Sequence, residues 1–466
     1  MGIKTTVMAG SDRDQLLALQ EGHFVDLKSR RIAPRDLQKH FVAFANTDGG
    51  DIYIGIEDPE VRGPRIRGFE KPEDANDVIQ ALSDVLPTVD GVDFEFLAFE
   101  RGGYVLHVSV PKSPRVHYTA DSECYIRRNA STRKIKGDTI TRLGYAKGSF
   151  SYENQLVDVD VESLLESPVL AQYLERIGTE LAADSFLQKQ KLIVYQGHNA
   201  QPTVAAVLLF DEEPQASLPT RCAIKVYRLN TTEREYKREY LAESPATIEG
   251  PLEQQIHSVI DHVNQLLSDA TYKVDGELIK LKYPAEALFE ILVNAVIHRD
   301  YSINDDIHVR VYDNRVEVQS PGRLPGSVTV DNILDERYAR NPKIVRLLHK
   351  LPEPVNHDIG EGLNTAKNAL HAAGLIPPSF LELENAFLVT IEHKQIASLE
   401  DLIVEHLRWN ETVSNKVIRQ LSGENSENKV KKAFQTLRGK QIIEPVDPNA
   451  NAFRFIYKRG PQFPKP

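Results

Sequence analysis

The residues best suited to chemistry lie near the N-terminus, where Glu21, Asp26 and Lys28 form the pattern E-x4-D-x-K. Alternate side chains of an extended strand share a face, so Asp26 and Lys28 are expected to project to the same side. Asp58 closes the nearby run DIYIGIED and can bring a third carboxylate to the same place. Three carboxylates can hold Mg²⁺ or Mn²⁺, the metal activates water, and a lysine stabilises developing negative charge, which suits phosphodiester hydrolysis. Solvated charges at a strand edge are the alternative explanation.

A second candidate is the basic segment 115–147, which contains eight Lys and Arg residues but only three acidic residues. Basic side chains contact phosphates and aromatic rings stack on bases, so this pattern suits RNA as well as DNA. A solvated charged surface is again the alternative. The residues that we expect to bind nucleic acid are Arg115, Tyr118, Tyr125, Arg127, Arg128, Arg133, Lys134 and Lys136.

A third candidate lies in the central part of the chain. The helical segment 284–301 places Glu290 and Asn294 four residues apart and therefore on one face, where such a pair can position water and bind Mg²⁺ on a nucleotide. A glycine-containing loop, DIGEGL, precedes a second helix at 363–373, whose N-terminus could receive phosphate. The residues expected at this nucleotide site are Glu290, Asn294, Gly322, Gly360 and Gly362.

Mixed α/β elements are expected to position the N-terminal candidates. Segments 23–28, 51–58 and 104–110 are rich in β-forming residues and predict strands. Segment 34–47 has apolar residues at helical spacing. The run NTDGG at 46–50 is expected to stop this helix, because glycine adopts the left-handed conformation found at helix ends.

Further elements follow along the chain. The apolar run TVAAVLLF at 203–210 predicts a buried strand, segment 222–229 predicts another strand, and apolar periodicity predicts a helix at 252–268. After residue 397 the pattern indicates three helices and a short β-pair, an order typical of a winged helix, which binds either DNA or protein. The positive face of its recognition helix would comprise Lys429, Lys431, Lys432, Arg438 and Lys440.

Charge is distributed unevenly along the 466 residues, whose net charge is −11. Residues 151–397 contain 23 basic and 37 acidic side chains, whereas residues 1–150 contain 21 and 22, and residues 398–466 contain 12 and 8. A polyanion is therefore expected to bind at the two ends of the chain.

Several classes of protein are excluded by composition. No stretch approaches the roughly 20 apolar residues that span a bilayer, and the N-terminus has no apolar signal segment. Cys124 and Cys222 are too few for a disulfide scaffold or a cysteine-based zinc site. We therefore expect a soluble cytoplasmic protein.

The N-terminal motifs resemble the Schlafen-type (AlbA-like) domain over roughly residues 15–150. That family has E-x4-E-F-K, AFANT-x-GG and IGV-x-D, and this chain has EGHFVDLK, AFANTDGG and IGIED. The resemblance implies a metal site formed by Glu21, Asp26 and Asp58, with Lys28 beside them as a fourth catalytic residue. Asp26 is one methylene shorter than the usual glutamate. Animal Schlafen cores pair two such lobes around RNA, so a chain with one lobe implies a homodimer.

Residues 284–393 resemble the GHKL-type ATPase-like region found downstream of Schlafen-type domains, which implies ATP as a ligand. GHKL proteins usually have an aspartate that binds the adenine amino group, and Ser320 occupies that position in Ser320-Pro321-Gly322. A serine can still hydrogen-bond a base. The alternative is a degenerate scaffold that has kept the fold in order to dimerise.

Together these features predict a multidomain α+β protein with four parts. The expected parts are a Schlafen-like mixed α/β domain at 1–150, an α/β connecting domain at 151–275, a GHKL-like α/β sandwich at 276–397 and a winged helix at 398–460. The favoured function is a metal-dependent endoribonuclease acting on structured RNA such as tRNA, with stress or phage defence as the biological role it would suit. The alternatives are a non-catalytic, nucleotide-responsive DNA-binding regulator and a GHKL-type ATPase.

Overall fold

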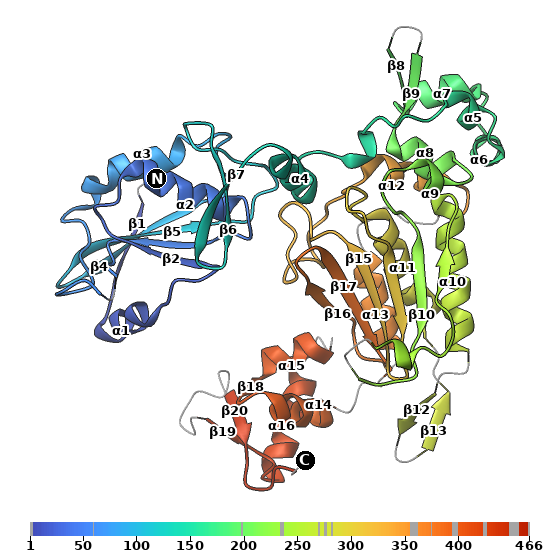
Figure 1. Ribbon diagram of the computed structural model, residues 1–466. Helices are drawn as coiled ribbons and strands as arrows, with labels where there is room; N and C mark the ends of the chain where they lie inside the picture. Colours follow the sequence, from blue (N-terminus) through green and yellow to red (C-terminus); the bar gives the residue numbers. More distant parts are fainter. Residues whose placement is uncertain are drawn as a thin grey trace. The chain divides into compact units, whose positions relative to one another are not determined.

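The chain is an α+β protein with several sheets, as the sequence predicted (Figure 1). The computed structural model describes residues 3–58, 60–196, 199–233, 237–268, 271–274, 277–280, 283–354, 362–373, 375–393, 399–422, 426–446 and 456–464. The chain divides into two compact units, one comprising Met1–Ser151 and Leu324–Tyr338, the other Tyr152–Arg323 and Ala339–Pro466. Among the described helices, none has both the length and the apolar character that crossing a membrane requires.

The first unit is built on a five-stranded mixed sheet with the order β1-β4-β5-β3-β2. Its core lies between this sheet and two helices, α2 and α3. The elements of this unit are β1 (Lys4–Val7), α1 (Gly10–Ala18), β2 (Val25–Lys28), α2 (Pro34–Ala45), β3 (Gly50–Ile54), α3 (Asn76–Ser83), β4 (Asp93–Phe99), β5 (Gly103–Val110), β6 (Cys124–Arg128), β7 (Ser131–Ile135) and α4 (Asp138–Lys147).

The connection from β2 through α2 to β3 positions the N-terminal candidate residues. β2 is an edge strand and pairs in parallel with β3, so the intervening helix must cross back over the sheet. The predicted helix stop is confirmed, because the last helical residue is Ala45 and Gly49 has a φ of +78°. Gly50 also has to be glycine, since a Cβ there would lie 2.6 Å from the carbonyl oxygen of Phe24.

A segment distant in sequence completes the first unit. Lys112 Nζ donates hydrogen bonds to the carbonyl oxygens of Leu324 (3.0 Å) and Val328 (3.1 Å). The Tyr338 hydroxyl donates to the carbonyl oxygen of Gly148 (2.7 Å). These contacts hold residues 324–338 against the N-terminal unit, although the segment lies within the expected ATPase-like part of the sequence.

The second unit contains a six-stranded sheet with the order β11-β10-β14-β15-β17-β16. Helices α10 and α11 pack on this sheet, and α13 packs on α11. Its elements up to residue 393 are α5 (Val161–Leu165), α6 (Pro168–Arg176), α7 (Ala183–Lys189), β8 (Ile193–Gln196), β9 (Asn199–Pro202), α8 (Val204–Phe210), α9 (Pro214–Ser217), β10 (Ile224–Arg228), β11 (Ala246–Ile248), α10 (Leu252–Leu267), β12 (Thr271–Val274), β13 (Glu277–Lys280), α11 (Ala285–Ile297), β14 (Ile307–Val311), β15 (Arg315–Pro321), α12 (Pro342–His349), α13 (Gly362–Ala372), β16 (Ser379–Glu382) and β17 (Ala386–Glu392).

The expected boundary between residues 275 and 276 does not separate two folds. β10 pairs in parallel with β14, with Ile224 opposite Ile307, so both sides of that boundary contribute to one sheet. A single apolar core also extends from Val157 to Ile391. The sequence missed this because the pairing of distant strands is invisible to local periodicity.

The strand expected at 203–210 is wrong, because this segment forms the helix α8. All seven residues from Val204 to Phe210 are buried, so the helix has no polar face and its apolar run looks like a buried strand. The Thr203 side chain caps the helix by accepting a hydrogen bond from the Ala206 amide (3.3 Å).

The C-terminal segment has its own small core, in which the rings of Phe434 and Tyr457 stack with their centroids 4.6 Å apart. Its three-stranded sheet has the order β18-β20-β19. The elements are α14 (Leu399–Trp409), β18 (Val413–Ser414), α15 (Asn415–Ser422), α16 (Glu427–Gly439), β19 (Ile443–Pro445) and β20 (Ile456–Arg459). Its assignment as a winged helix stays a prediction.

Candidate nucleic-acid and nucleotide sites

Lys28 lies between two of the predicted catalytic carboxylates. Its Nζ is 2.9 Å from Glu21 Oε1 and 2.7 Å from Asp26 Oδ1. Glu21 also accepts a hydrogen bond from the Leu27 amide (3.0 Å), which fixes it against β2. The structure therefore brings three of the four predicted residues together, with Asp26 and Lys28 on the same side of the strand.

Asp26 is enclosed by two cations, Lys28 and Arg127, and by the His40 ring. Only 1% of its side chain is exposed, and its Oδ2 lies 2.7 Å from His40 Nδ1 and 3.1 Å from Arg127 Nη1. Burial alone raises the pKa of Asp26, but the close contact with His40 and the charge of Lys28 outweigh burial and hold the pKa well below its usual value. The carboxylate is therefore ionised, and both of its oxygens already face cations.

Asp58 does not join this group. It is exposed, and no described contact links its side chain to Glu21 or Asp26. Glu57 instead points back toward the end of β2, where its Oε1 accepts a hydrogen bond from the Ser29 hydroxyl (2.9 Å).

The described residues include no group of three His, Cys, Asp or Glu side chains that could hold a metal ion. All three predicted ligands are among the described residues, so Glu21, Asp26 and Asp58 as placed do not fit Mg²⁺ or Mn²⁺. The reason is physical: the cations Lys28 and Arg127 already contact the buried carboxylate that would have to bind the metal.

His40 is a residue of this site that the sequence interpretation missed. It lies on α2, 26% of its side chain is exposed, and the Thr132 hydroxyl oxygen is 3.2 Å from its Nδ1. The available signal was the strand–helix–strand order, because a helix that connects two parallel neighbouring strands must lie over them. That order alone does not say which helical residue reaches Asp26.

Two residues predicted to contact nucleic acid are buried instead. Arg127 donates to the carbonyl oxygens of Gly22 (2.7 Å) and Val25 (3.0 Å), and its guanidinium lies over the Phe44 ring at 4.4 Å. Tyr125 is only 8% exposed. Because both side chains point into the core beside α2, Arg127 cannot reach a phosphate and Tyr125 cannot offer its ring to a base.

Some of the remaining basic residues are engaged within the protein, and others are exposed. Lys134 forms an ion pair with Glu123, and Lys147, also in this segment, is buried and donates to the carbonyl oxygen of Ala45 (2.9 Å). Tyr118 is half-buried. The predicted cations Arg115, Arg128, Arg133 and Lys136 are exposed.

Arg128 and Arg133 share one face of the β6–β7 hairpin. Ile126 pairs with Arg133 and Arg128 pairs with Ser131. Paired residues of antiparallel strands lie on the same face, as do alternate residues along a strand. The two guanidinium groups are therefore neighbours on the face opposite to the one that carries the buried Tyr125 and Arg127.

In the second unit, three predicted nucleotide-binding residues meet where α11 and α13 pack together. A Cβ at Gly362, the first residue of α13, would lie 2.4 Å from Glu290 Oε2 and 3.1 Å from Asn294 Nδ2. Glycine is therefore required for this approach. Glu290 is buried, with 7% of its surface exposed.

The other predicted nucleotide residues lie elsewhere or outside the described residues. Gly322 approaches Asp300, with a hypothetical Cβ 2.6 Å from that residue's Cβ. Ser320 is buried and its hydroxyl donates to the carbonyl oxygen of Ala295 (2.7 Å), so that its proton is already engaged within the fold. Gly360 lies outside the described residues.

Comparison with known proteins gives two family matches. Residues 21–136 match the family model "Schlafen, AlbA_2", and residues 304–391 match the model "Putative ATP-dependent DNA helicase recG C-terminal". No curated protein matches the chain. Among solved structures, the DIP2311 protein from Corynebacterium diphtheriae is 18% identical, with 97% of this chain and 96% of that chain covered and a TM-score of 0.41.

The first match begins at Glu21, the first residue of the predicted constellation, and ends at Lys136, the last of the predicted nucleic-acid contacts. Both matches support a function related to nucleic acids. The chain thus contains a Schlafen AlbA_2 domain at residues 21–136 and an ATPase-like region of the recG C-terminal type at residues 304–391.

Proposed function

We propose that this protein is a DNA-binding regulator that responds to a nucleotide, and that its AlbA_2 domain binds phosphates without a metal. The observation that carries the proposal is the enclosure of Asp26 by Lys28, His40 and Arg127. Because the carboxylate is neutralised by the protein itself, the constellation stabilises the domain and does not repel a nearby phosphate chain.

The exposed cations supply the contact surface. Arg128 and Arg133, on one face of the hairpin, together with Arg115 and Lys136, would bind phosphates, a contact that is independent of base sequence. Burial of Tyr125 removes one of the two tyrosines expected to stack on bases, which weakens the argument for single-stranded RNA.

The C-terminal segment would add a second contact. The apolar residues of α16 are buried on one side, and its lysines Lys429, Lys431 and Lys432 are exposed. A helix with this polarity suits the major groove of DNA, which favours duplex DNA over structured RNA. Glu290, Asn294 and Gly362 would form the nucleotide site through which the regulator responds.

A metal-dependent endoribonuclease is the second candidate, because Glu21 and Asp26 converge on one ammonium group. For this function Lys28 would have to leave both carboxylates and Asp58 would have to approach them. The geometry therefore favours the first candidate.

The test uses the full chain with labelled duplex DNA and single-stranded RNA of the same sequence, in EDTA and in Mn²⁺. Binding is measured by fluorescence anisotropy and cleavage by gel electrophoresis. We expect DNA binding in EDTA that weakens steeply as salt increases from about 50 to about 200 mM. The double variant Arg128→Ala/Arg133→Ala should weaken it, whereas the matched control Lys71→Ala/Arg101→Ala, which removes two exposed cations elsewhere in the first unit, should not.

Two results would contradict the proposal. Absence of binding to either nucleic acid would exclude a nucleic-acid-binding regulator. Cleavage that requires Mn²⁺ and is abolished by Glu21→Ala and by Asp58→Ala would establish the nuclease instead.

A further inference from the structure

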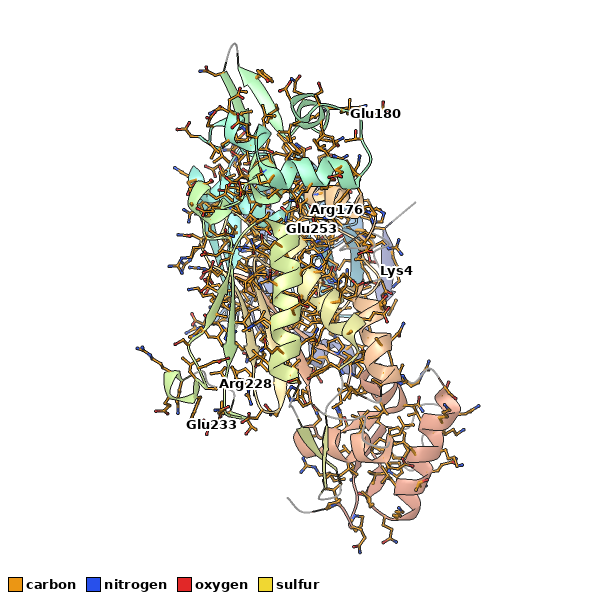
Figure 2. The ribbon with its side chains drawn as sticks, turned by 90° about the vertical axis from the view of Figure 1, so that its right-hand side faces the viewer. Lys4, Arg176, Glu180, Arg228, Glu233 and Glu253 are labelled. Carbon is orange, nitrogen blue, oxygen red and sulfur yellow. The ribbon has the colours of Figure 1, made fainter. Side chains whose placement is uncertain are left out.

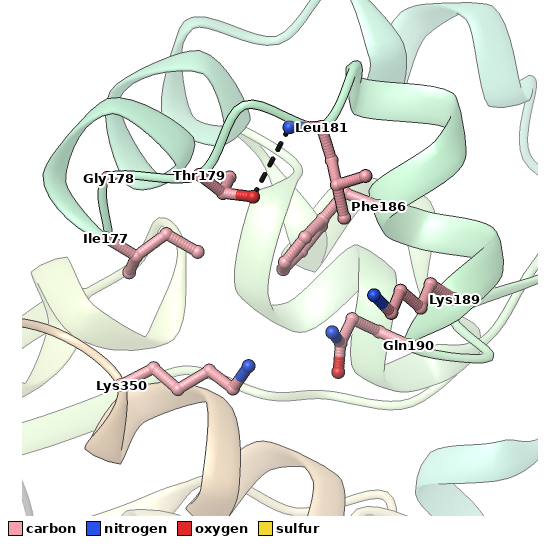
Figure 3. Close-up of a pocket in the computed structure, with 8 residues that line it drawn as sticks. All are labelled: Ile177, Gly178, Thr179, Leu181, Phe186, Lys189, Gln190 and Lys350. Atoms are coloured by element: carbon pink, nitrogen blue, oxygen red, sulfur yellow. Dashed lines mark hydrogen bonds between the residues drawn. The ribbon is translucent and has the colours of Figure 1, made fainter.

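A pocket in the second unit lies outside both sites described above. It has a volume of about 400 Å³ and is formed by the connection between α6 and α7, by α7 itself and by the residue that follows α12 (Figure 3). Binding pockets for small molecules range from about 300 to 1,000 Å³, so this one suits a small ligand.

One wall of the pocket is apolar. It consists of Ile177, Leu181 and Phe186, whose side chains converge in Figure 3. Phe186 is 1% exposed and belongs to the main core, so this wall is anchored to the rigid part of the unit. Leu181 is 37% exposed, so its side chain is accessible to a ligand in the pocket.

The opposite wall is cationic. Lys189, the last residue of α7, and Lys350, the residue after α12, are both exposed, and Figure 3 shows their ammonium ends on either side of the Gln190 amide. Neither lysine forms an ion pair with any described residue. Gln190 Oε1 accepts a hydrogen bond from Arg346 Nη1 (2.6 Å), which leaves the amide nitrogen of Gln190 to donate.

The charge of this wall is opposite to that of its surroundings. Residues 151–397 contain 37 acidic and 23 basic side chains, yet two lysines without a carboxylate partner face this pocket. The nearby Arg176, on α6, differs because it is paired with Glu253 at 2.7 Å (Figure 2). Two cations that line one pocket favour an anion between them.

We propose that this pocket binds a small organic anion, with its carboxylate or phosphate group between Lys189 and Lys350 and its compact apolar body against Ile177, Leu181 and Phe186. The Gln190 amide would donate a further hydrogen bond to the anionic group. A mixed lining of this kind, apolar with a few convergent polar groups, is typical of ligand sites.

The test is saturation-transfer difference NMR on the full chain with three probes of similar size. Phenyl phosphate and phenylacetate carry the two anionic groups, and benzyl alcohol is the uncharged control. We expect saturable binding of at least one anion. The anion with the lower dissociation constant identifies whether the site prefers phosphate or carboxylate. Lys189→Glu and Lys350→Glu should each raise the dissociation constant by about tenfold or more, the usual effect of losing a charge-assisted hydrogen bond.

Lys191→Glu is the matched control, because it makes the same change of charge two residues from Lys189 on an exposed side chain that does not line the pocket. Its dissociation constants should stay within about twofold of the wild-type values, well short of the loss expected of a direct contact. The proposal is overturned if neither anion binds, if benzyl alcohol binds as tightly as the anions, or if Lys191→Glu weakens binding as much as Lys189→Glu. Leu181→Asp is a second variant, and it should also abolish binding because it places a like charge on the apolar wall.

Discussion

Asp26 and Arg127 form an ion pair that water does not reach, with Oδ2 and Nη1 3.1 Å apart and side-chain exposures of 1% and 0%. The pair joins the edge strand β2 to the hairpin strand β6, about 100 residues later in the chain. Arg127 also donates to the carbonyl oxygens of Gly22 and Val25, which keeps the chain before β2 in place. Arg127 therefore stabilises the core of the domain, although it belongs to the basic segment that was expected to bind nucleic acid.

Arg127→Ala is therefore expected to destabilise the first unit and not merely to reduce affinity for nucleic acid. Removal of Arg127 leaves the negative charge of the buried Asp26 carboxylate with one cation fewer to balance it. Such a change lowers the free energy of unfolding by about 3–5 kcal/mol. Urea denaturation of the full chain, followed by circular dichroism and tryptic digestion of the first unit, measures the effect.

Arg133→Ala is the matched control for this experiment, because it removes an exposed arginine from the same hairpin. Its unfolding free energy should change by no more than about 0.5 kcal/mol. Full stability of Arg127→Ala, accompanied by loss of nucleic-acid binding, would restore the interpretation of Arg127 as a contact residue.

Stability should also depend on pH through Asp26. Because its folded-state pKa lies below the usual 3.8, the stabilisation is present above that value and is lost as the pH falls toward the folded-state pKa. The difference in unfolding free energy between wild type and Asp26→Asn should therefore shrink from about pH 5 to about pH 2. Denaturant unfolding at several pH values measures this difference.

Asp58→Asn serves as the control for general charge effects, since Asp58 is an exposed carboxylate in the same unit. It should differ little from wild type at every pH. A constant difference between wild type and Asp26→Asn over the same range would mean that the ion pairs of Asp26 do not stabilise the fold.

The sequence predicted those features that depend on short-range geometry. Alternation along a strand placed Asp26 and Lys28 on one side, and helical spacing placed Glu290 beside Asn294. Glycine chemistry predicted where α2 ends. Each of these conclusions needs only the residues of one element.

The features that the sequence did not predict depend on burial and on distant pairing. The charge of Arg127 is visible in the sequence, but its position beneath the β6–β7 hairpin is set by carbonyl groups about 100 residues earlier. The segment 203–210 is apolar throughout, so periodicity could not distinguish a buried helix from a buried strand. Likewise, the pairing of β10 with β14, which unites two expected domains, leaves no local pattern.

Ser320→Asp restores the aspartate usual in GHKL proteins, but we expect it to unfold the second unit instead of creating an adenine contact. Ser320 is 8% exposed and its hydroxyl donates to the carbonyl oxygen of Ala295 on α11. An aspartate there would bury a carboxylate next to a carbonyl oxygen, at a cost of about 3 kcal/mol or more. Ser320→Ala, which loses only one hydrogen bond, should cost about 1–2 kcal/mol. Thermal unfolding compares the two, and a folded Ser320→Asp variant that binds ATP more tightly than wild type would contradict the expectation.

Gly362→Ala tests whether the nucleotide site lies where α11 and α13 meet. The added methyl group would lie 2.4 Å from Glu290 Oε2 and must displace that carboxylate, which is the end of a flexible side chain, so the fold should survive. Affinity for a fluorescent ATP analogue should fall about tenfold or more, equivalent to about 1.4 kcal/mol of binding free energy. Gly439→Ala is the control, since a Cβ at that position meets no atom within 4 Å. If wild type binds no analogue, or if both variants bind it equally well, ATP is not bound at this junction.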